Sequence, residues 1–265
     1  MIFPIGDDNS DRTSFPIVNV VLIAINVVVF VFLQGMGSNI EFTFAFSTVP
    51  AEIINGTDLV TTDETIQVDT PEGPRELVQP GLQKTPISVY LTLLTSMFMH
   101  GGIAHLLGNM WFLWVFGDNI EHDIGRVRYV FFYLMCGLLA SLTHVLLNTG
   151  GPSSTVPSLG ASGAISGVMG AYLVLHPKRR VTVLLFRMVT QVPGFVAVGM
   201  WFVFQVISSL GVLGGMETGV AYGAHIGGFV AGAALAKPFL FRRSLPQNDS
   251  WRERARSEWP RSGDR

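Results

Sequence analysis

One uncharged stretch, residues 157–177, constrains this chain most, because it begins as a loop and continues as an apolar helix. The loop part is rich in Gly, Pro and Ser, and the helical part, 161–176, contains no charge. Sixteen helical residues extend about 24 Å, less than the roughly 30 Å of hydrocarbon in a bilayer. In a membrane, the preceding loop must therefore dip below the surface, which is tolerated only beside protein or a water-filled cavity. Ser162 then stands at a submerged helix N-terminus, and its hydroxyl is a candidate nucleophile.

The composition supports a membrane environment for that helix. The chain has 265 residues, of which 49% are hydrophobic and 14% are charged, whereas soluble domains are about a quarter charged. We therefore expect an all-α polytopic membrane protein. Cys136 is the only cysteine, so the sequence allows no intrachain disulfide and no CxxC motif. A cleavable signal peptide is not expected, because the first apolar run is long and follows an acidic, polar start.

Six apolar runs predict six transmembrane helices. They cover approximately residues 15–33, 86–116, 127–147, 161–176, 188–213 and 220–241. Around them we predict a polar, disordered leader at 1–14, a membrane domain at 15–241 and a basic cytoplasmic tail at 242–265. Within the membrane domain lie a long acidic outside loop at 35–85, with a strand at 61–68, and a short charged loop at 117–126.

The basic residues predict which side of the membrane each loop faces. Six spans put both termini on the same side. If that side is the cytoplasm, the inside segments hold 15 of the 17 Lys and Arg residues, and only Arg75 and Lys84 lie outside. The mouth near Ser162 then opens to the extracytoplasmic side, and we expect the membrane to be a prokaryotic plasma membrane.

Histidines are the titratable side chains at depth in the predicted spans: His100, His105, His144 and His225. Ionisable residues inside a bilayer indicate function by default. His225 begins the sixth helix at the predicted depth of Ser162, and Gly228 and Gly232 below it form a GxxxG face that can pack on the small residues of the fourth helix. That packing brings the imidazole to the serine hydroxyl, which is the minimum for an activated oxygen nucleophile. Alternatively, Ser162 caps its helix and His225 bonds a neighbouring carbonyl. Spacing alone leaves both interpretations open.

The second predicted helix places His105 and Asn109 on one face, because they are four residues apart. Acyl transfer needs donors where a carbonyl oxygen becomes negative, and these side chains with the Ser162 N–H are suitable donors. Alternatively, the pair bonds one helix to another. A metal site from His100, His105 and His225 is less favoured, because the chain has no HExxH and no carboxylate at depth. We expect neither metal nor cofactor. We interpret His144 and His176 as structural. His122 lies in the charged loop and is expected to be solvated.

Three motifs together resemble the signature of the rhomboid intramembrane serine proteases. They are His100-Gly101-Gly102 with His105 and Asn109, Gly160-Ala161-Ser162-Gly163, and Ala224-His225 with Gly228 and Gly232. They occur in the family's order, on its second, fourth and sixth helices, across residues 86–240. The resemblance implies a six-helix fold with a short fourth helix that carries the nucleophile, and a serine endopeptidase with a Ser–His dyad.

The resemblance also implies a role for each matched residue. Ser162 is the nucleophile and His225 the general base, while His105 and Asn109, with the Ser162 N–H, hold the oxyanion. Gly160 belongs to the same oxyanion and substrate-binding group. Two departures concern supporting residues: the first outside loop lacks the Trp-Arg pair of many members, and Ser166 stands where some members place an aromatic beneath the histidine. Glu121 resembles a structural position of the family.

The expected partners are membrane proteins with single or multiple spans, as substrates, and the lipid bilayer, but no nucleic acid. A substrate helix must unwind before its carbonyls can be attacked, so segments with Gly, Pro or polar residues near the outer interface are preferred. The uncharged loop at 148–160 gives water and such a segment access to Ser162. One rival function is that of a non-catalytic client binder, although inactive relatives usually lack the serine or the histidine. Another is that of a small-solute transporter, but the paired broken helices and buried carboxylates typical of transporters are missing from the sequence.

Overall fold

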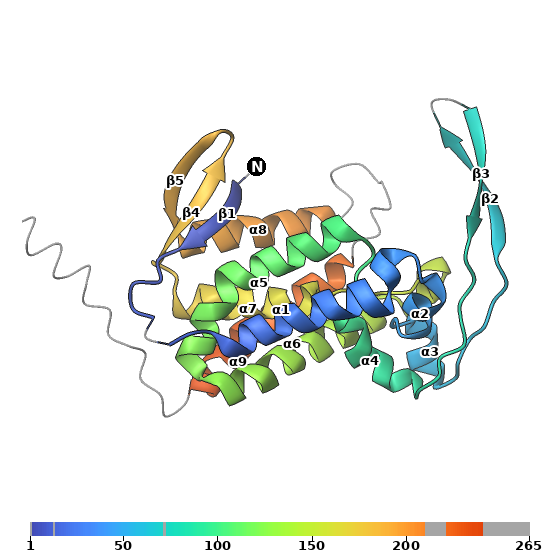
Figure 1. The fold of residues 1–265 in the computed structure, drawn as a ribbon, viewed down its shortest axis with the longest axis horizontal. Coiled ribbons are helices and arrows are strands. Elements are labelled where there is room, and N and C mark those ends of the chain that lie inside the picture. The colour runs from blue at the N-terminus through green and yellow to red at the C-terminus, as the bar shows by residue number, and fades with distance from the viewer. Residues whose placement is uncertain (1, 13, 71–72, 210–220, 241–265) are drawn as a thin grey trace, which may run out of the picture.

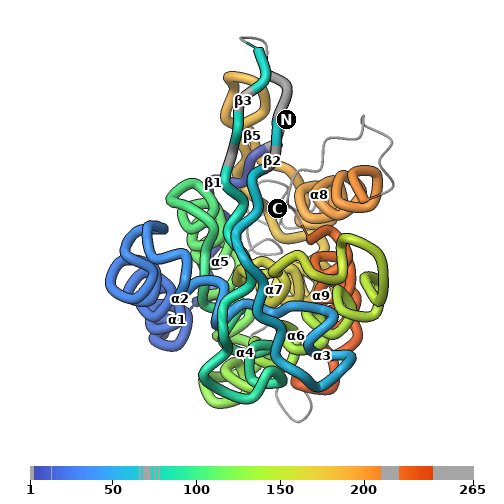
Figure 2. Tube along the Cα trace, turned by 90° about the vertical axis from the view of Figure 1, so that its right-hand side faces the viewer, coloured from blue at the N-terminus to red at the C-terminus, as the bar shows by residue number. Residues whose placement is uncertain are grey.

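The computed structural model describes residues 2–12, 14–70, 73–209 and 221–240, so the predicted tail at 242–265 lies outside the described residues. Its longer helices lie side by side (Figure 1): α1 (Ile17–Val28), α5 (Ile103–Ile124), α6 (Arg126–Leu147), α7 (Ser162–Leu175), α8 (Gly194–Ser209) and α9 (Tyr222–Leu240). Figure 2, which looks along the helices, shows α7 at the centre between α5, α6 and α9. Residues 163–172 of α7 are all buried, as its small and apolar sequence predicts.

Glycines bring α7 and α9 into backbone contact. A Cβ built on Gly228 would lie 2.0 Å from the Gly163 carbonyl oxygen, and one on Gly232 would lie 1.9 Å from that of Gly167. Only glycine fits at such a distance, so the predicted packing of the two glycine faces is confirmed. Cys136 on α6 is fully buried against Gly167, so its side chain packs between α6 and α7.

The helices meet the length requirement for a membrane span unequally. In the described part of the chain, α6 is long and apolar enough to cross a bilayer, and a second span results if the bent pair Val89–Phe98 and Ile103–Ile124 is taken as one. Shorter apolar helices are Ile17–Leu33, Ser162–Leu175 and Gly194–Ser209. Large apolar side chains are exposed on the outside of the bundle, as expected of surfaces that face lipid. Examples are Phe32 in η1 (Val29–Leu33), which continues α1, Phe131 on α6 and Phe204 on α8.

The predicted continuous helix at 86–116 is wrong, because the chain breaks at residues 99–102. Short helical turns, η3 (Val89–Leu91), α4 (Thr92–Thr95) and η4 (Ser96–Phe98), precede the break, and α5 follows it at an angle of 79°. The sequence at the break is rich in glycine, which stabilises a helix poorly. The predicted loop at 117–126 is also wrong. α5 continues to Ile124 because the polar side chains near its end are buried among partners, and Gly125, with φ of +85°, separates it from α6.

A small sheet corrects three further expectations. Strands β1 (Ile2–Asp7), β4 (Arg180–Leu185) and β5 (Met188–Pro193) pair antiparallel in the order β1-β4-β5. The N-terminal leader is therefore ordered at 2–7 rather than disordered. The fifth apolar run begins as a strand and becomes helical only at Gly194. The chain is consequently mostly helical rather than all-α.

Polar contacts anchor β1 and the residues after it to the helices. Asp7 Oδ2 accepts hydrogen bonds from Asn119 Nδ2 on α5 at 2.6 Å and from the Tyr172 hydroxyl on α7 at 2.8 Å. Arg179 forms an ion pair with Asp11 at 2.5 Å. These partners explain why a polar N-terminal segment is ordered, because its side chains bond to groups on α5, on α7 and in the segment after α7.

Glu121 performs a similar function for α1. Its carboxylate accepts hydrogen bonds from the backbone N–H groups of Val18, at 3.1 Å, and Asn19, at 2.7 Å. An acidic group is favourable at a helix N-terminus because it satisfies free N–H groups and complements the helix dipole. Glu121 thus joins α5 to the start of α1.

The connection at 35–85 contains local structure. It holds η2 (Gly35–Gly37), α2 (Ile40–Ala45), α3 (Pro50–Asn55) and the antiparallel strands β2 (Glu64–Thr70) and β3 (Gly73–Gln79). The strand predicted at 61–68 is confirmed, with its start at Glu64. Both views show this hairpin extending beyond the helices (Figures 1 and 2). A two-way backbone bridge between Thr48 and Ser158, at 3.0 and 2.8 Å, ties the connection to the loop before α7.

Candidate functional site

Ser162 is the first residue of α7, and the loop before it is held from two sides. The Thr48–Ser158 bridge fixes one part of the loop, and the Gly160 N–H donates to the Ser96 carbonyl at 2.9 Å. Gly160 has φ of +129°, a conformation that side chains rarely adopt, so glycine is required there. The Ser162 side chain is half-buried, which leaves its hydroxyl accessible.

The Ser162 hydroxyl and the His225 imidazole form a hydrogen bond. Ser162 Oγ lies 2.7 Å from His225 Nε2, and His225 is 9% exposed on the first turn of α9. The cap position of α7 is Ala161, without a side-chain cap bond, so the alternative in which Ser162 caps its helix is wrong. The glycine contacts of α7 and α9 begin one turn below this pair and set the separation of the two side chains.

His105 and Asn109 lie on α5, and both have a donor available. The Gly101 N–H points to His105 Nδ1 at 3.3 Å. Nδ1 is therefore the acceptor, which places the ring proton on Nε2. His105 Nε2 lies next to Gly160, where a Cβ would be 3.0 Å from it. Asn109 is 9% exposed, and its Nδ2 has no hydrogen-bond partner among the described residues. His105 is thus next to the loop before Ser162, and Asn109 lies one turn further along the same face of α5. N–H donors of this kind suit the stabilisation of a developing oxyanion.

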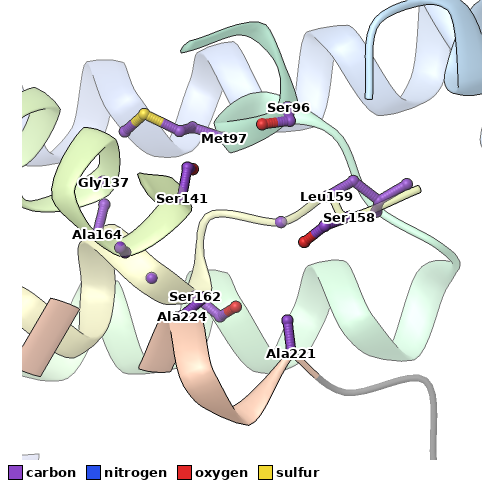
Figure 3. Close-up of a pocket in the computed structure, with 13 residues that line it drawn as sticks. Ser96, Met97, Gly137, Ser141, Ser158, Leu159, Ser162, Ala164, Ala221 and Ala224 are labelled. Atoms are coloured by element: carbon purple, nitrogen blue, oxygen red, sulfur yellow. The ribbon is translucent and has the colours of Figure 1, made fainter. Parts of the chain in front are cut away.

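A pocket opens beside Ser162 (Figure 3). Its walls are mostly glycine, alanine and serine residues, including Ser96, Ser141 and Ser158. In the close-up, Ala221 and Ala224 lie on the α9 side of the pocket and Leu159 lies in the loop. The small side chains and hydroxyls leave room for a small group next to the Ser162 hydroxyl.

Two residues of α8 that we did not single out contact His225. Gln205 Oε1 lies 2.8 Å from His225 Nδ1, and the Trp201 ring centroid is 6.1 Å from that of His225, with the ring planes inclined at 36°. Ser166, which stands where some family members place an aromatic beneath the histidine, donates a hydrogen bond to the Ser162 carbonyl at 2.6 Å. The sequence does contain one indication of a role for Gln205: it is an amide within an apolar run, and polar side chains in membrane segments are rarely without function.

The other histidines take part in separate contacts. His176 Nε2 lies 2.5 Å from Asp123 Oδ2, a structural contact as predicted. The backbone carbonyl of His144 accepts a hydrogen bond from Asn148 Nδ2 at 2.8 Å. His122 lies half-buried on α5, so its predicted place in a solvated loop is wrong. His100 is fully buried with its ring 5.2 Å from that of His105. Among the described residues, no three His, Cys, Asp or Glu side chains are grouped to hold a metal ion.

Comparison with known proteins finds one family and several relatives. Residues 88–242 match the Rhomboid domain. The chain is 35% identical over 148 residues to "Rhomboid protease GluP" of Bacillus subtilis, covering 55% of this chain and 26% of that protein. It is 33% identical over 150 residues to "RHOMBOID-like protein 1" of Arabidopsis thaliana, covering 57% of this chain and 34% of that protein. It is 26% identical over 199 residues to the mitochondrial "Presenilin-associated rhomboid-like protein" of Homo sapiens, covering 69% of this chain and 50% of that protein. The chain thus spans a quarter to a half of these relatives.

Proposed function

This chain belongs to the rhomboid family, a family of intramembrane serine proteases, and we propose that it hydrolyses peptide bonds in or near the transmembrane segments of other membrane proteins. One observation carries the proposal: the 2.7 Å contact between Ser162 Oγ and His225 Nε2. A serine hydroxyl becomes nucleophilic when a neighbouring base accepts its proton. Ser162 is accordingly the nucleophile and His225 the general base of a dyad.

The proposed arrangement in the membrane has six spans, formed by α1, the α4–α5 segment, α6, α7, α8 and α9. The exposed apolar side chains on the outside of the bundle support it. Arg126, Lys178 and Lys237 lie at the helix ends opposite Ser162 and His225, and the positive-inside rule assigns that end to the cytoplasm. The dyad then opens to the extracytoplasmic side of a prokaryotic plasma membrane.

The reaction has two steps. Ser162 Oγ attacks the carbonyl carbon of the scissile peptide, and its proton passes to His225 Nε2. When the tetrahedral intermediate collapses, the C–N bond breaks, the leaving amine takes that proton, and the substrate acyl group remains as an ester on Ser162. Water then gives a proton to His225 and adds to the ester carbonyl, which releases the acid and restores the serine hydroxyl. In both steps the oxyanion accepts from His105 Nε2–H, Asn109 Nδ2 and the Ser162 N–H, which precedes the first hydrogen-bonded turn of α7.

The pocket beside Ser162 bears on the substrate. Its glycine, alanine and serine walls favour a small side chain next to the bond that is cleaved. The bond must also leave its helix before Ser162 can attack, since helical carbonyls are engaged in hydrogen bonds. A transmembrane segment with Gly, Ser or Pro near its extracytoplasmic end satisfies both requirements.

The test combines a serine-directed label with cleavage in lipid. The purified full chain in detergent is treated with a fluorophosphonate and its mass is measured. In parallel, the chain is reconstituted in liposomes with a single-span protein that has Gly and Ser near the outer end of its span. We expect the wild-type chain to form one adduct on Ser162 and to cleave the substrate. The Ser162→Ala and His225→Ala variants should show neither the adduct nor cleavage. Asn109→Ala should retain a rate reduced by about 10²–10³, which is typical for the loss of one oxyanion donor.

A matched control exists on the same helix as the nucleophile. Ser166→Ala removes another hydroxyl from α7, so it should retain the adduct and the cleavage. Cleavage by Ser162→Ala at the wild-type rate contradicts the proposal. A folded wild-type chain that neither labels nor cleaves is inconsistent with a protease and favours the client-binding alternative.

A further inference from the structure

The amide of Gln205 is buried and directed at the catalytic base. Gln205 is 7% exposed and its Oε1 lies 2.8 Å from His225 Nδ1. The two residues come from different helices, Gln205 from the C-terminal half of α8 and His225 from the first turn of α9. The eleven residues before Gln205 in α8 are apolar or glycine. A single amide in such a helix is unfavourable in a membrane unless it has a partner, and His225 is that partner.

We propose that Gln205 is a positioning residue that holds His225 in the tautomer and orientation required of the base. This inference rests on the proposed function. A carbonyl oxygen only accepts hydrogen bonds, so the contact with Gln205 Oε1 requires a proton on His225 Nδ1. A neutral imidazole then has a lone pair on Nε2, the atom that lies 2.7 Å from Ser162 Oγ. With the opposite tautomer, Nε2 would carry a proton and would not accept one from the serine.

The same acceptor acts again during the reaction. When His225 takes the serine proton it becomes an imidazolium, and its Nδ1–H bond to Gln205 strengthens because the donor is now charged. The amide thus stabilises the transition state more than the ground state, which is what accelerates a chemical step. Gln205 contributes the hydrogen-bonding part of the role that a carboxylate has in a catalytic triad, without a buried negative charge.

Trp201 supports the same assignment. It lies four residues before Gln205, so both side chains lie on one face of α8, and its ring contacts the His225 ring. α8 therefore provides His225 with a hydrogen-bond acceptor and an aromatic neighbour. A displacement of α8 away from α9 would remove both, so the base is competent only while α8 is packed against α9.

The experiment compares substitutions of Gln205 in the full chain reconstituted in liposomes. Gln205→Leu keeps the approximate size but has no acceptor, whereas Gln205→Glu keeps an acceptor and adds a charge. Ser209→Ala removes an exposed hydroxyl from the same helix and serves as the control. For each variant, kcat, KM, the pH dependence of kcat, the rate of fluorophosphonate labelling and Tm are measured.

Gln205→Leu should lower kcat and the labelling rate about 10–100-fold, the usual effect of losing a hydrogen bond to a charged group, while KM stays within about twofold. Gln205→Glu should restore most of kcat. Its charge should also stabilise the imidazolium and move the acid limb of the kcat profile upward by roughly one pH unit. Ser209→Ala should match the wild type. A purely structural amide predicts neither the rescue nor the displaced limb.

Two results would overturn the inference. One is a Gln205→Leu protein with wild-type kcat. The other is an equal loss of kcat in Gln205→Leu and Gln205→Glu that is accompanied by a proportional loss of Tm, with no displacement of the pH profile of kcat. Ser162→Ala separates this failure from that of the proposed function. If Ser162→Ala is inactive and Gln205→Leu is not impaired, the positioning role alone is wrong, whereas an active Ser162→Ala protein removes both.

Discussion

Replacing Gly228 with alanine should inactivate the site through a helix displacement. The new Cβ would lie 2.0 Å from the Gly163 carbonyl oxygen, whereas ordinary contacts begin at 3.4 Å. The clash is between backbones, so no side-chain rotation relieves it, and α9 must move away from α7 by about 1 Å or more. His225 is one turn before Gly228 and Ser162 directly precedes Gly163. A movement of that size takes the pair from 2.7 Å beyond hydrogen-bond distance.

The expected consequence is a loss of about 100-fold in kcat, the scale of effect of a 1 Å misplacement of catalytic groups. Overpacking of this kind also costs about 1–3 kcal/mol of stability. The assay is cleavage of the single-span substrate in liposomes, together with fluorophosphonate labelling and Tm in detergent. Labelling is informative because it reports the activation of Ser162 without a requirement for substrate binding.

Two further glycine variants make the result interpretable. A Cβ on Gly199 in α8 has nothing within 4 Å, so Gly199→Ala should keep its activity and gain slightly in Tm, because alanine favours the helix. Gly232→Ala clashes equally with α7 but two turns from His225, so it should lose similar stability and less activity. If Gly228→Ala retains more than half of the wild-type rate, the α7–α9 contact does not set the geometry of the dyad.

The remaining predictions concern the end of the bundle opposite the dyad. Glu121→Ala removes the acceptor of the Val18 and Asn19 N–H groups, so it should lower the free energy of unfolding by about 1–3 kcal/mol and Tm by roughly 2–4 °C per kcal/mol. Thermal unfolding in detergent measures this, and an unchanged Tm would contradict it. Burial and the nearby Asp118 carboxylate raise the pKa of Asp7 from 3.8 to about 7. Between these values the folded chain keeps a proton that the unfolded chain has lost, so stability should fall as the pH rises from about 4 to 7. Asp7→Asn should flatten that slope and raise Tm at pH 8 by roughly 2–4 °C, and an unchanged slope would refute the assignment.

The sequence was informative about the helices because hydrophobic runs without charge have few alternatives. α6 begins and ends within one residue of its predicted bounds, and α7 follows from an uncharged stretch rich in small residues. The paired glycine faces predicted which helices meet, since GxxxG positions indicate close approach. The contact between Ser162 and His225 follows from those two facts together.

Other features could not be read from local pattern. The break before α5 lies inside a run that is hydrophobic enough to continue as a helix, and β5 lies in a run apolar enough to begin one. Whether such runs become helix or strand depends on partners distant in sequence, here β1 for β4 and β4 for β5. The order of the N-terminal segment likewise depends on Asn119 and Tyr172, more than a hundred residues away.

By itself, the sequence determined the chemical groups of the proposed site, because the three motifs contain the serine, the histidine and the donors of α5. Only the tertiary structure decided what surrounds the base. Gln205 and Trp201 come from a helix with no motif, and their contact with His225 exists only because α8 packs against α9. The physical reason is that periodicity and motifs report the preferences of one segment, whereas the tautomer of a buried histidine depends on a neighbour from another.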